Sequence, residues 1–219
     1  MEADDQSAMN DEFAGTYDDS VDEYGYHPEM LSGLCFEYVK KGDRLLDIGI
    51  GTGLASLNFA KFGVEVHGID SSNGMLDVCR SKDFAVDLKK HDLRDLPLPC
   101  ADNSFDHVMS SGVFHFFDDL NPIFREVARI IRPEGMFAFI VRDQAVTDGV
   151  TEDDLDPDGY VGHDTHYGVK VYMHGEGYIG SLIESCGFEC LKEFKFLLAS
   201  GLEGLDDFVF KAYVTQKSA

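Results

Sequence analysis

The sequence predicts an α/β fold: a doubly wound, mostly parallel seven-stranded sheet with an antiparallel hairpin at one edge and helices at the N-terminus. Three observations carry this prediction. Strand-like and helix-like segments alternate between Arg44 and Val141, alternate glycines follow the first strand, and two strand-like segments close the C-terminal part. Such an alternation is typical of a parallel sheet with helices on both faces.

The first 40 residues form a region of their own, an acidic tail followed by a helical lid, and residues 41–219 form the main domain. Residues 1–10 have the composition of a frayed tail. Two helices are expected between Asp11 and Lys40, with a break near Gly25–Pro28. Pro28 suits the first turn of the second helix, because proline has no N–H to leave unpaired there.

The alternation begins with a strand at Arg44–Ile48, a short apolar run of the kind that a buried parallel strand shows. A helix at Leu54–Phe62 follows, and Gly63 ends it, since glycine is favoured just past a helix C-terminus. The elements expected next are strand Val64–Ile69, helix Ser72–Ser81, strand Phe84–Lys90, strand Phe105–Ser110, helix Asn121–Ile131 and strand Gly135–Val141.

Residues 143–173 interrupt the pattern with an irregular insertion rich in Asp, Gly and His. A loop of this length in a compact domain is typically a lid or a binding segment. A helix is expected at Glu176–Ser185. Strands at Phe188–Leu197 and Asp207–Val214, joined by a turn that contains glycine, predict the antiparallel hairpin at the sheet edge.

The net charge of -23 is the strongest signal in the composition. Phosphate backbones and anionic lipid surfaces repel such a protein, so we expect neither nucleic acid nor membrane as a partner. The first Lys or Arg in the chain is Lys40, and a second acidic stretch covers Thr151–Asp158. A solvated surface that favours solubility is the simpler interpretation of this acidity, and steering of a cationic substrate is the second.

Targeting and cysteine patterns indicate a cytoplasmic protein. No apolar run reaches the length of a membrane span, and the acidic N-terminus is unlike a secretory signal. The five cysteines are odd in number and contain no CxxC pair, which favours free thiols in a reducing compartment over disulfides or a zinc site.

The central motif is the turn after the first strand, Asp47-Ile48-Gly49-Ile50-Gly51-Thr52-Gly53. Without Cβ atoms, these glycines let the backbone turn tightly and approach a ligand closely. Asp70 follows at the end of the next strand, where a carboxylate can accept both hydroxyl groups of a ribose. Together the turn and the acid predict a nucleoside site.

The glycine spacing indicates which class of nucleoside ligand the turn binds. The dinucleotide fingerprint is G-x-G-x-x-G, whereas Leu54 stands at its third position here and the glycines follow G-x-G-x-G. The acid at Asp47 suits a positively charged group better than a pyrophosphate. The pattern therefore favours a cationic nucleoside over a dinucleotide.

The run LLDIGIGTGLASLNFAKFGVEVHGID, residues 45–70, resembles the first motif of class I S-adenosylmethionine-dependent methyltransferases. The resemblance continues through residues 91–99, 103–111 and 120–141, and is strongest to the small-molecule group that includes ubiquinone- and menaquinone-biosynthesis methyltransferases. It implies a Rossmann-like methyltransferase fold, S-adenosylmethionine as cofactor and S-adenosylhomocysteine as product.

The resemblance also implies roles for ten residues around the cofactor. The residues at its methionine end and ribose would be Asp47, Gly49, Gly51 and Gly53, with Ser110 and Ser111 near the methionine end. The residues at its ribose hydroxyls and adenine would be Asp70, Ser71, Asp92 and Leu93.

Methyl transfer is an in-line displacement at a sulfonium carbon, so the enzyme mainly positions the two reactants. A base is needed only where the acceptor must lose a proton. His115 follows the fourth strand and is the candidate base, with a packing histidine as the alternative interpretation. A small-molecule acceptor, possibly cationic, is the expected partner.

Aromatic and histidine side chains are the candidate acceptor contacts: Tyr17, Tyr24, His163, His166 and Tyr167. Tyr17 is the preferred single contact, because aromatic rings stack on substrates or surround cations. His163, His166 and His174 share the irregular insertion with Asp164, but their spacing matches no familiar ligand set, so no metal is expected.

Two other functions stay open at this point. An NAD(P)-dependent oxidoreductase would share the fold and the ribose acid, although the glycine spacing argues against it. A non-catalytic S-adenosylmethionine-binding regulatory protein would keep the same site residues. The sequence leaves the methyl acceptor, the atom methylated and the choice between monomer and homodimer undecided.

Overall fold

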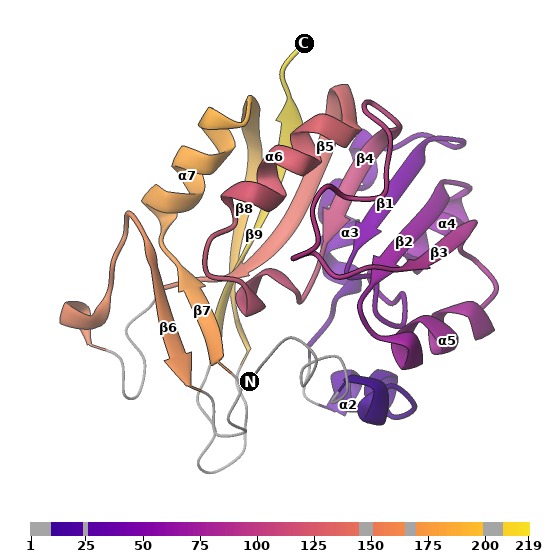
Figure 1. Ribbon diagram of the computed structural model, residues 1–219, viewed down its shortest axis with the longest axis horizontal. Coiled ribbons are helices and arrows are strands. Elements are labelled where there is room, and N and C mark those ends of the chain that lie inside the picture. The colour runs from indigo at the N-terminus through magenta and orange to yellow at the C-terminus, as the bar shows by residue number, and fades with distance from the viewer. Residues whose placement is uncertain (1–9, 24–25, 145–150, 165–169, 199–207) are drawn as a thin grey trace.

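The computed structural model describes the chain except for residues 1–9, 24–25, 145–150, 165–169 and 199–207. A seven-stranded sheet runs through the molecule in the order β3-β2-β1-β4-β5-β9-β8 (Figure 1). The strands are β1 (Arg44–Ile48), β2 (Glu65–Asp70), β3 (Asp87–Lys90), β4 (Phe105–Ser110), β5 (Ile131–Arg142), β8 (Phe188–Leu198) and β9 (Phe208–Lys217).

Five of these strands are parallel and two close one edge. β3, β2, β1, β4 and β5 run in the same direction, and β9 lies antiparallel between β5 and β8. The predicted mostly parallel sheet with an antiparallel edge hairpin is confirmed. The carboxyl ends of the parallel strands meet at the lower side of Figure 1, which is the edge where ligands bind in folds of this kind.

Helices cover both faces of the sheet, as a doubly wound fold requires. One face packs against α6 (Asn121–Ile130) and α7 (Glu176–Ser185), through residues such as Phe124 and Ile179. The other packs against α3 (Glu29–Cys35), α4 (Leu57–Phe62) and α5 (Asn73–Ser81), through residues such as Leu31, Phe59 and Leu76. The two cores hold the parallel strands rigidly from both sides.

The N-terminal region packs on one face of the sheet and also reaches the carboxyl edge of the sheet. α3 and the short 3-10 helix Phe36–Tyr38 lie over one face of the sheet, and α3 contacts α4, β5 and β9. Residues 10–13 are helical, and α2 (Tyr17–Glu23) lies below the sheet at the carboxyl edge (Figure 1). α2 is thus placed beside the end of the sheet where the glycine turn lies.

The insertion at 143–173 contains more regular structure than the sequence predicts. β6 (Tyr160–Asp164) and β7 (Lys170–His174) form a separate antiparallel hairpin, preceded by a 3-10 helix at Glu152–Asp154. In β7, Val171, Met173 and His174 are buried, whereas Lys170 is exposed and Tyr172 is half-buried. The polar residues of β6 give no sequence signal for a strand. The hairpin is therefore stabilised by the packing of β7 rather than by strand propensity.

Several element ends differ from the sequence-based expectation. α4 begins at Leu57 rather than Leu54, because residues 51–56 continue the turn, with the Gly53 N–H donating to the Ile50 carbonyl. β3 begins at Asp87, and β5 reaches back to Ile131 across an irregularity in its pairing with β4. Over the described ranges, every helix is too short or too polar to cross a membrane.

Candidate active site at the carboxyl edge of the sheet

The glycine turn that follows β1 has a left-handed backbone conformation at its glycines. Gly49 and Gly53 have φ values of 71° and 88°, and a Cβ at either would lie 2.2 Å from Val113 or 2.4 Å from Phe84. Gly51 has φ 54°, yet a Cβ there would meet nothing within 4 Å. Two of the glycines therefore allow tight packing, and the third leaves an open stretch of backbone.

Asp70 ends β2 beside this turn. The Gly51 and Ser72 backbone N–H groups donate to its two carboxylate oxygens, each at 2.8 Å. Burial raises the pKa of Asp70, and the N–H groups of Ser72, Gly51 and Ser71 oppose that rise. The carboxylate is consequently fixed at the mouth of the turn.

Asp47 at the end of β1 is only 1% exposed. Neither of its carboxylate oxygens has a hydrogen-bond partner among the described residues, and the same holds for the Ser56 hydroxyl. Burial raises the pKa of Asp47 to about 7, an effect that nearby Ser56 opposes and the Asp70 carboxylate reinforces. Buried polar atoms without partners are rare, so this carboxylate suits a cation or donor supplied by a ligand.

α2 is tied to this edge through Asp18. Its carboxylate forms an ion pair with Lys82 at 2.5 Å and accepts a hydrogen bond from the Thr52 hydroxyl at 2.5 Å. Lys82 also donates to the Thr52 carbonyl at 2.8 Å. Because Thr52 belongs to the glycine turn, this contact joins α2, the turn and the end of α5. We call Asp18, Thr52 and Lys82 the latch.

A second carboxylate holds the segment before α2. Asp11 accepts hydrogen bonds from the Ser72 hydroxyl at 2.5 Å and from the Gly74 N–H at 2.8 Å. These bonds lower the pKa of Asp11. A Cβ at Gly74 would lie 2.9 Å from the Asp11 backbone, so only glycine permits this approach.

On the β4 side, a group of aromatic and polar side chains faces the same edge. The Tyr26 hydroxyl lies 2.9 Å from the Ser111 hydroxyl. The Phe210 ring lies 6.0 Å from the Tyr26 ring and 6.2 Å from the His115 ring. The Ser110 hydroxyl is turned away and donates to the Ile48 carbonyl at 2.9 Å.

His115 is uncharged at neutral pH. Burial, with Arg142 and His174 nearby, lowers its pKa to about 3. Its Nδ1 is buried with no hydrogen-bond partner among the described residues. A neutral imidazole with a free nitrogen can accept a hydrogen bond, but it binds a proton weakly.

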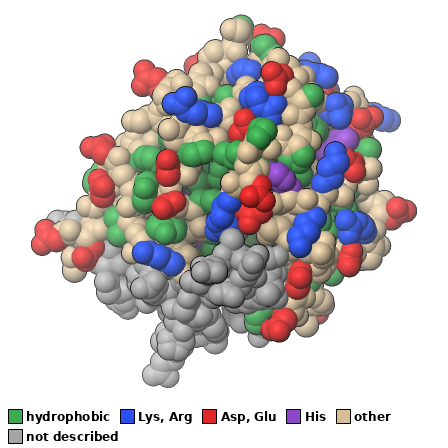
Figure 2. All heavy atoms as spheres, viewed as in Figure 1, with side chains coloured by type: hydrophobic (Ala, Val, Ile, Leu, Met, Phe, Trp, Pro, Cys, Tyr) green, Lys and Arg blue, Asp and Glu red, His purple; other side chains and the backbone are tan. Residues whose placement is uncertain are grey.

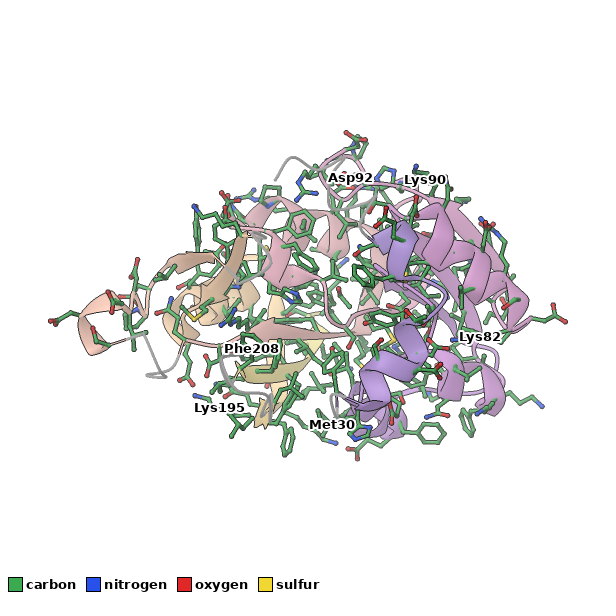
Figure 3. The ribbon with its side chains drawn as sticks, turned by 90° about the horizontal axis from the view of Figure 1, so that it is seen from below. Met30, Lys82, Lys90, Asp92, Lys195 and Phe208 are labelled. Carbon is green, nitrogen blue, oxygen red and sulfur yellow. The ribbon has the colours of Figure 1, made fainter. Side chains whose placement is uncertain are left out.

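Arg142 ends β5 close to His115. It is 5% exposed, and its guanidinium lies 4.2 Å over the Phe208 ring. Figure 3 looks onto this edge and labels Phe208 on the β8–β9 side, across the molecule from Lys82 and Asp92. A permanent positive charge therefore stands on the β5 side of the edge.

A cavity of about 340 Å³ opens between α2, the start of α3 and the start of α4. Its lining includes the acids Asp18, Asp19 and Glu29, and Tyr26 stands in its wall. Tyr26 thus separates an acidic cavity from the side chains around His115.

The remaining predicted residues fall at different places. Asp92 accepts a hydrogen bond from the Arg94 N–H at 2.8 Å, and Leu93 is buried. Ser71 is half-buried beside Asp70. Tyr17 lies close enough to Asp18 and Asp70 for their charges to reinforce the effect of burial, which raises its pKa to about 12.

Some predicted acceptor contacts cannot be placed. Tyr24, His166 and Tyr167 lie outside the described residues. The backbone of His163 lies in β6, opposite Val171, on the hairpin. Within the described ranges, no group of three or more His, Cys, Asp or Glu side chains is arranged to hold a metal ion.

Sequence reasoning missed the latch, Asp11 and Arg142. Asp18 and Lys82 are 64 positions apart, and neither belongs to a motif, so the pattern gave no signal for their pairing. Arg142 had a signal, because an arginine directly after an apolar strand points to the carboxyl edge of the sheet.

Comparison with known proteins agrees with this geometry. Residues 46–139 match a family model described as a methyltransferase domain. A malonyl-[acyl-carrier protein] O-methyltransferase of Serratia marcescens is 34% identical over 126 residues, which are 58% of this chain and 48% of that protein. A demethylmenaquinone methyltransferase of Corynebacterium kroppenstedtii is 38% identical over 96 residues, 44% of this chain and 40% of that protein.

The chain thus spans about half or less of the length of these curated relatives. Among solved structures, the fold is similar to that of the 1,6-didemethyltoxoflavin-N1-methyltransferase of Burkholderia thailandensis, determined with bound 1,6-didemethyltoxoflavin and S-adenosylhomocysteine. The TM-score is 0.66 at 16% identity, over 100% of this chain and 92% of that one.

Proposed function

We propose that this chain, which contains a methyltransferase domain across residues 46–139 and has the fold of S-adenosylmethionine-dependent methyltransferases, transfers a methyl group to a small-molecule acceptor. The observation that carries the proposal is Asp47. A buried carboxylate with two unpartnered oxygens beside an open glycine turn suits a ligand that is cationic and nucleoside-like at once.

The residues of the turn fit S-adenosylmethionine. Asp47 would pair with a positive charge at its methionine end, and the open backbone at Gly51 leaves room for the ligand against the chain. Asp70 would hold the ribose hydroxyls, since its orientation is already set by two backbone N–H groups. Asp92 and Leu93 follow β3, the neighbour of β2 in the sheet, and would contact the adenine.

When bound, S-adenosylmethionine supplies a methyl group activated on a sulfonium, so the protein has to orient the acceptor and exclude water. α2, held by the latch, covers the turn. Tyr26 and Ser111 would position the acceptor from the β4 side. His115, with a free Nδ1 and a low pKa, would accept a hydrogen bond from the acceptor and orient it, and an acceptor with an acidic proton would suit this neutral imidazole best.

The acidic cavity beside Tyr26 supports an acceptor with a cationic group. Asp18, Asp19 and Glu29 would favour that group on the α2 side. Arg142 disfavours a positive charge next to His115, so the cation has to lie away from β5. Tyr17, beside Asp70, would contact the acceptor where it meets the cofactor.

The other functions have less support. An NAD(P)-dependent oxidoreductase needs room for a pyrophosphate at the turn, and Asp47 would repel it. A purely regulatory S-adenosylmethionine-binding protein has no need of the aromatic and polar groups around Ser111. For the cell compartment we propose the cytoplasm, supported by five cysteines that are all unpaired.

Calorimetric titration with S-adenosylhomocysteine and, separately, NAD tests the proposal. We expect S-adenosylhomocysteine alone to bind, and Asp70→Ala to weaken its binding by about 100-fold or more, since the variant loses charge-assisted hydrogen bonds. Asp87→Ala, an exposed acid on β3, is the matched control. Binding of NAD, or of neither ligand by a chain with an intact thermal transition, would contradict the proposal.

A further inference from the structure

β8 is the outermost strand of the main sheet. In the part of the chain that the structure describes, it pairs with β9 on one side only, from Phe188 to Leu198. An edge strand presents a row of backbone N–H and C=O groups that can pair with another strand. At eleven residues, β8 offers a long row of such groups.

The middle of β8 is exposed on both faces of the sheet. Glu193, Phe194 and Lys195 are three consecutive exposed residues, and consecutive side chains in a strand point to opposite faces. Phe194 is 43% exposed and Leu197 is 58% exposed. Both faces are therefore partly open at the middle of this edge, and two large apolar side chains are about half exposed to solvent.

The sequence of β8 is complementary to itself in the antiparallel direction. With Phe194 placed opposite the Phe194 of a second copy, Glu193 lies opposite Lys195 on either side of the axis, within the regular part of β8 that follows the register shift between Cys190 and Lys192. Opposed partners share a face in this register, because each pair is separated by an even number of positions. Opposite charges and apolar pairs directly across a ladder stabilise a sheet.

The charge of the strand fits the same register. β8 carries Glu189, Glu193, Lys192 and Lys195, so it is neutral on a chain with a net charge of -23. Most other surfaces of so acidic a molecule repel a second copy. A neutral, partly apolar edge is where two copies can approach.

We propose that two copies of this chain pair through β8, antiparallel and around a two-fold axis at Phe194, to form one continuous fourteen-stranded sheet. Such an interface is isologous, as in most homodimers, because the same strand serves both copies. The Glu193 and Lys195 side chains, which now contact Lys211 and Asp143 within one copy, would gain a partner across the axis.

Sedimentation velocity tests the interface. At about 1 M KCl, which shortens the range of charge repulsion to about 3 Å, we expect a wild-type dimer at micromolar concentration. Phe194→Asp places two like charges on the axis and should weaken the dimer by about 100-fold or more. Val86→Asp is the matched control, since Val86 is 60% exposed and directly precedes β3, at the opposite edge of the sheet from β8.

Cysteine cross-linking tests the register. Opposed Cα atoms in an antiparallel ladder lie about 4.5–5.5 Å apart, within the reach of a disulfide. In a Cys190→Ser background, we expect Phe194→Cys to yield a covalent dimer on mild oxidation. Leu197→Cys, at a more exposed position that lies off the axis, should yield none.

Three outcomes would overturn the proposal. One is a wild-type chain that stays monomeric at high salt, which is also the result expected if β8 pairs only with a strand of another protein. Another is a dimer that Phe194→Asp leaves intact while the variant melts normally. The third is cross-linking at residue 197 but not at residue 194.

Discussion

At the scale of single residues, the buried carboxylate of Asp47 links stability to ligand binding. Its pKa of about 7 lies above the ordinary value of 3.8, so the native chain holds this proton more tightly than the unfolded chain does. Stability from this group is present below about pH 4 and is lost as the pH rises through about 7. Ionisation of Asp47 in the ligand-free protein therefore lowers the free energy of unfolding above about pH 7.

Asp47→Asn should remove this loss of stability. We expect the variant without ligand to be more stable than the wild type at pH 8 by about 1–4 kcal/mol, with a Tm that is higher by at least about 2 °C. The difference should become small near pH 4, where the carboxyl group is protonated in the native chain and about half protonated in the unfolded chain. Differential scanning calorimetry across this pH range measures it, and a variant less stable at pH 8 would contradict the argument.

The same residue makes ligand affinity depend on pH. A cationic ligand favours the ionised form of Asp47, so S-adenosylhomocysteine should bind about tenfold more tightly at pH 8 than at pH 6. The Asp47→Asn variant should bind weakly, with little change over this range. Calorimetry in buffers of different ionisation enthalpy should detect proton release on binding to the wild type alone.

The place in the fold of residues with a motif could be predicted from the sequence, and the place of residues without one could not. Asp47 and Asp70 stand at the ends of two predicted strands, and the glycines follow the first of them, so their place at the carboxyl edge followed from the predicted strands alone. Asp11 depends on a close approach of two distant segments, which only Gly74 allows. A contact of that kind is decided by packing in three dimensions and leaves no local pattern.

At the scale of elements, we expect the latch to restrain α2 at the glycine turn. Lys82→Gln removes the ion pair to Asp18 and weakens the tie to Thr52. We expect the dissociation rate of S-adenosylhomocysteine to rise about three- to tenfold, in line with the loss of one partly buried ion pair. The Tm should change little, because the main core is untouched.

Stopped-flow displacement measures this rate, with Arg80→Gln as the control. Arg80 lies on the same helix and pairs with Asp77, but both side chains of that pair are largely exposed. An equal change in the two variants would mean that α2 does not restrain the ligand. A slower release from Lys82→Gln would mean the same.

The alternation of strands and helices was enough to predict the main sheet, its parallel core and its edge hairpin. Apolar runs such as Leu45–Ile48, with Gly42 shortly before it and Gly49 directly after it, are clearly bounded. The β6–β7 hairpin was missed because its sequence is polar and glycine-rich, and its order comes from β7 lying on β5 and on the 3-10 helix at Phe114–Phe116. Local propensity says little about an element that depends on its neighbours.

At the scale of the whole molecule, acidity sets the response to salt. On the face shown in Figure 2, most Lys and Arg side chains gather on the side of the sheet formed by β1 to β4, and Asp and Glu side chains are spread around the outline. With a net charge of -23, the folded chain repels itself, and unfolding relieves that repulsion. Added salt screens it.

We expect the Tm to rise by about 5 °C or more between 0.1 and 1 M KCl, as the screening length falls from about 10 Å to about 3 Å. At pH 5, nearer the sequence pI of 4.4, the rise should shrink because less charge remains. Thermal scans over a grid of salt and pH measure both effects. A Tm that falls with salt at pH 7.5 would contradict this account.

The position of β9 between β5 and β8 has a consequence for the order in which the chain is made. β8 is synthesised before β9, yet β9 is the neighbour to which it bonds, so β8 has no place in the sheet until β9 has emerged. The strands that carry Asp47, Asp70 and Ser110 are all complete long before then. A nascent chain can therefore assemble the strands that carry Asp47, Asp70 and Ser110 first, and it gains Phe210, which lies beside His115, only when β9 pairs with β5 and brings β8 into the sheet.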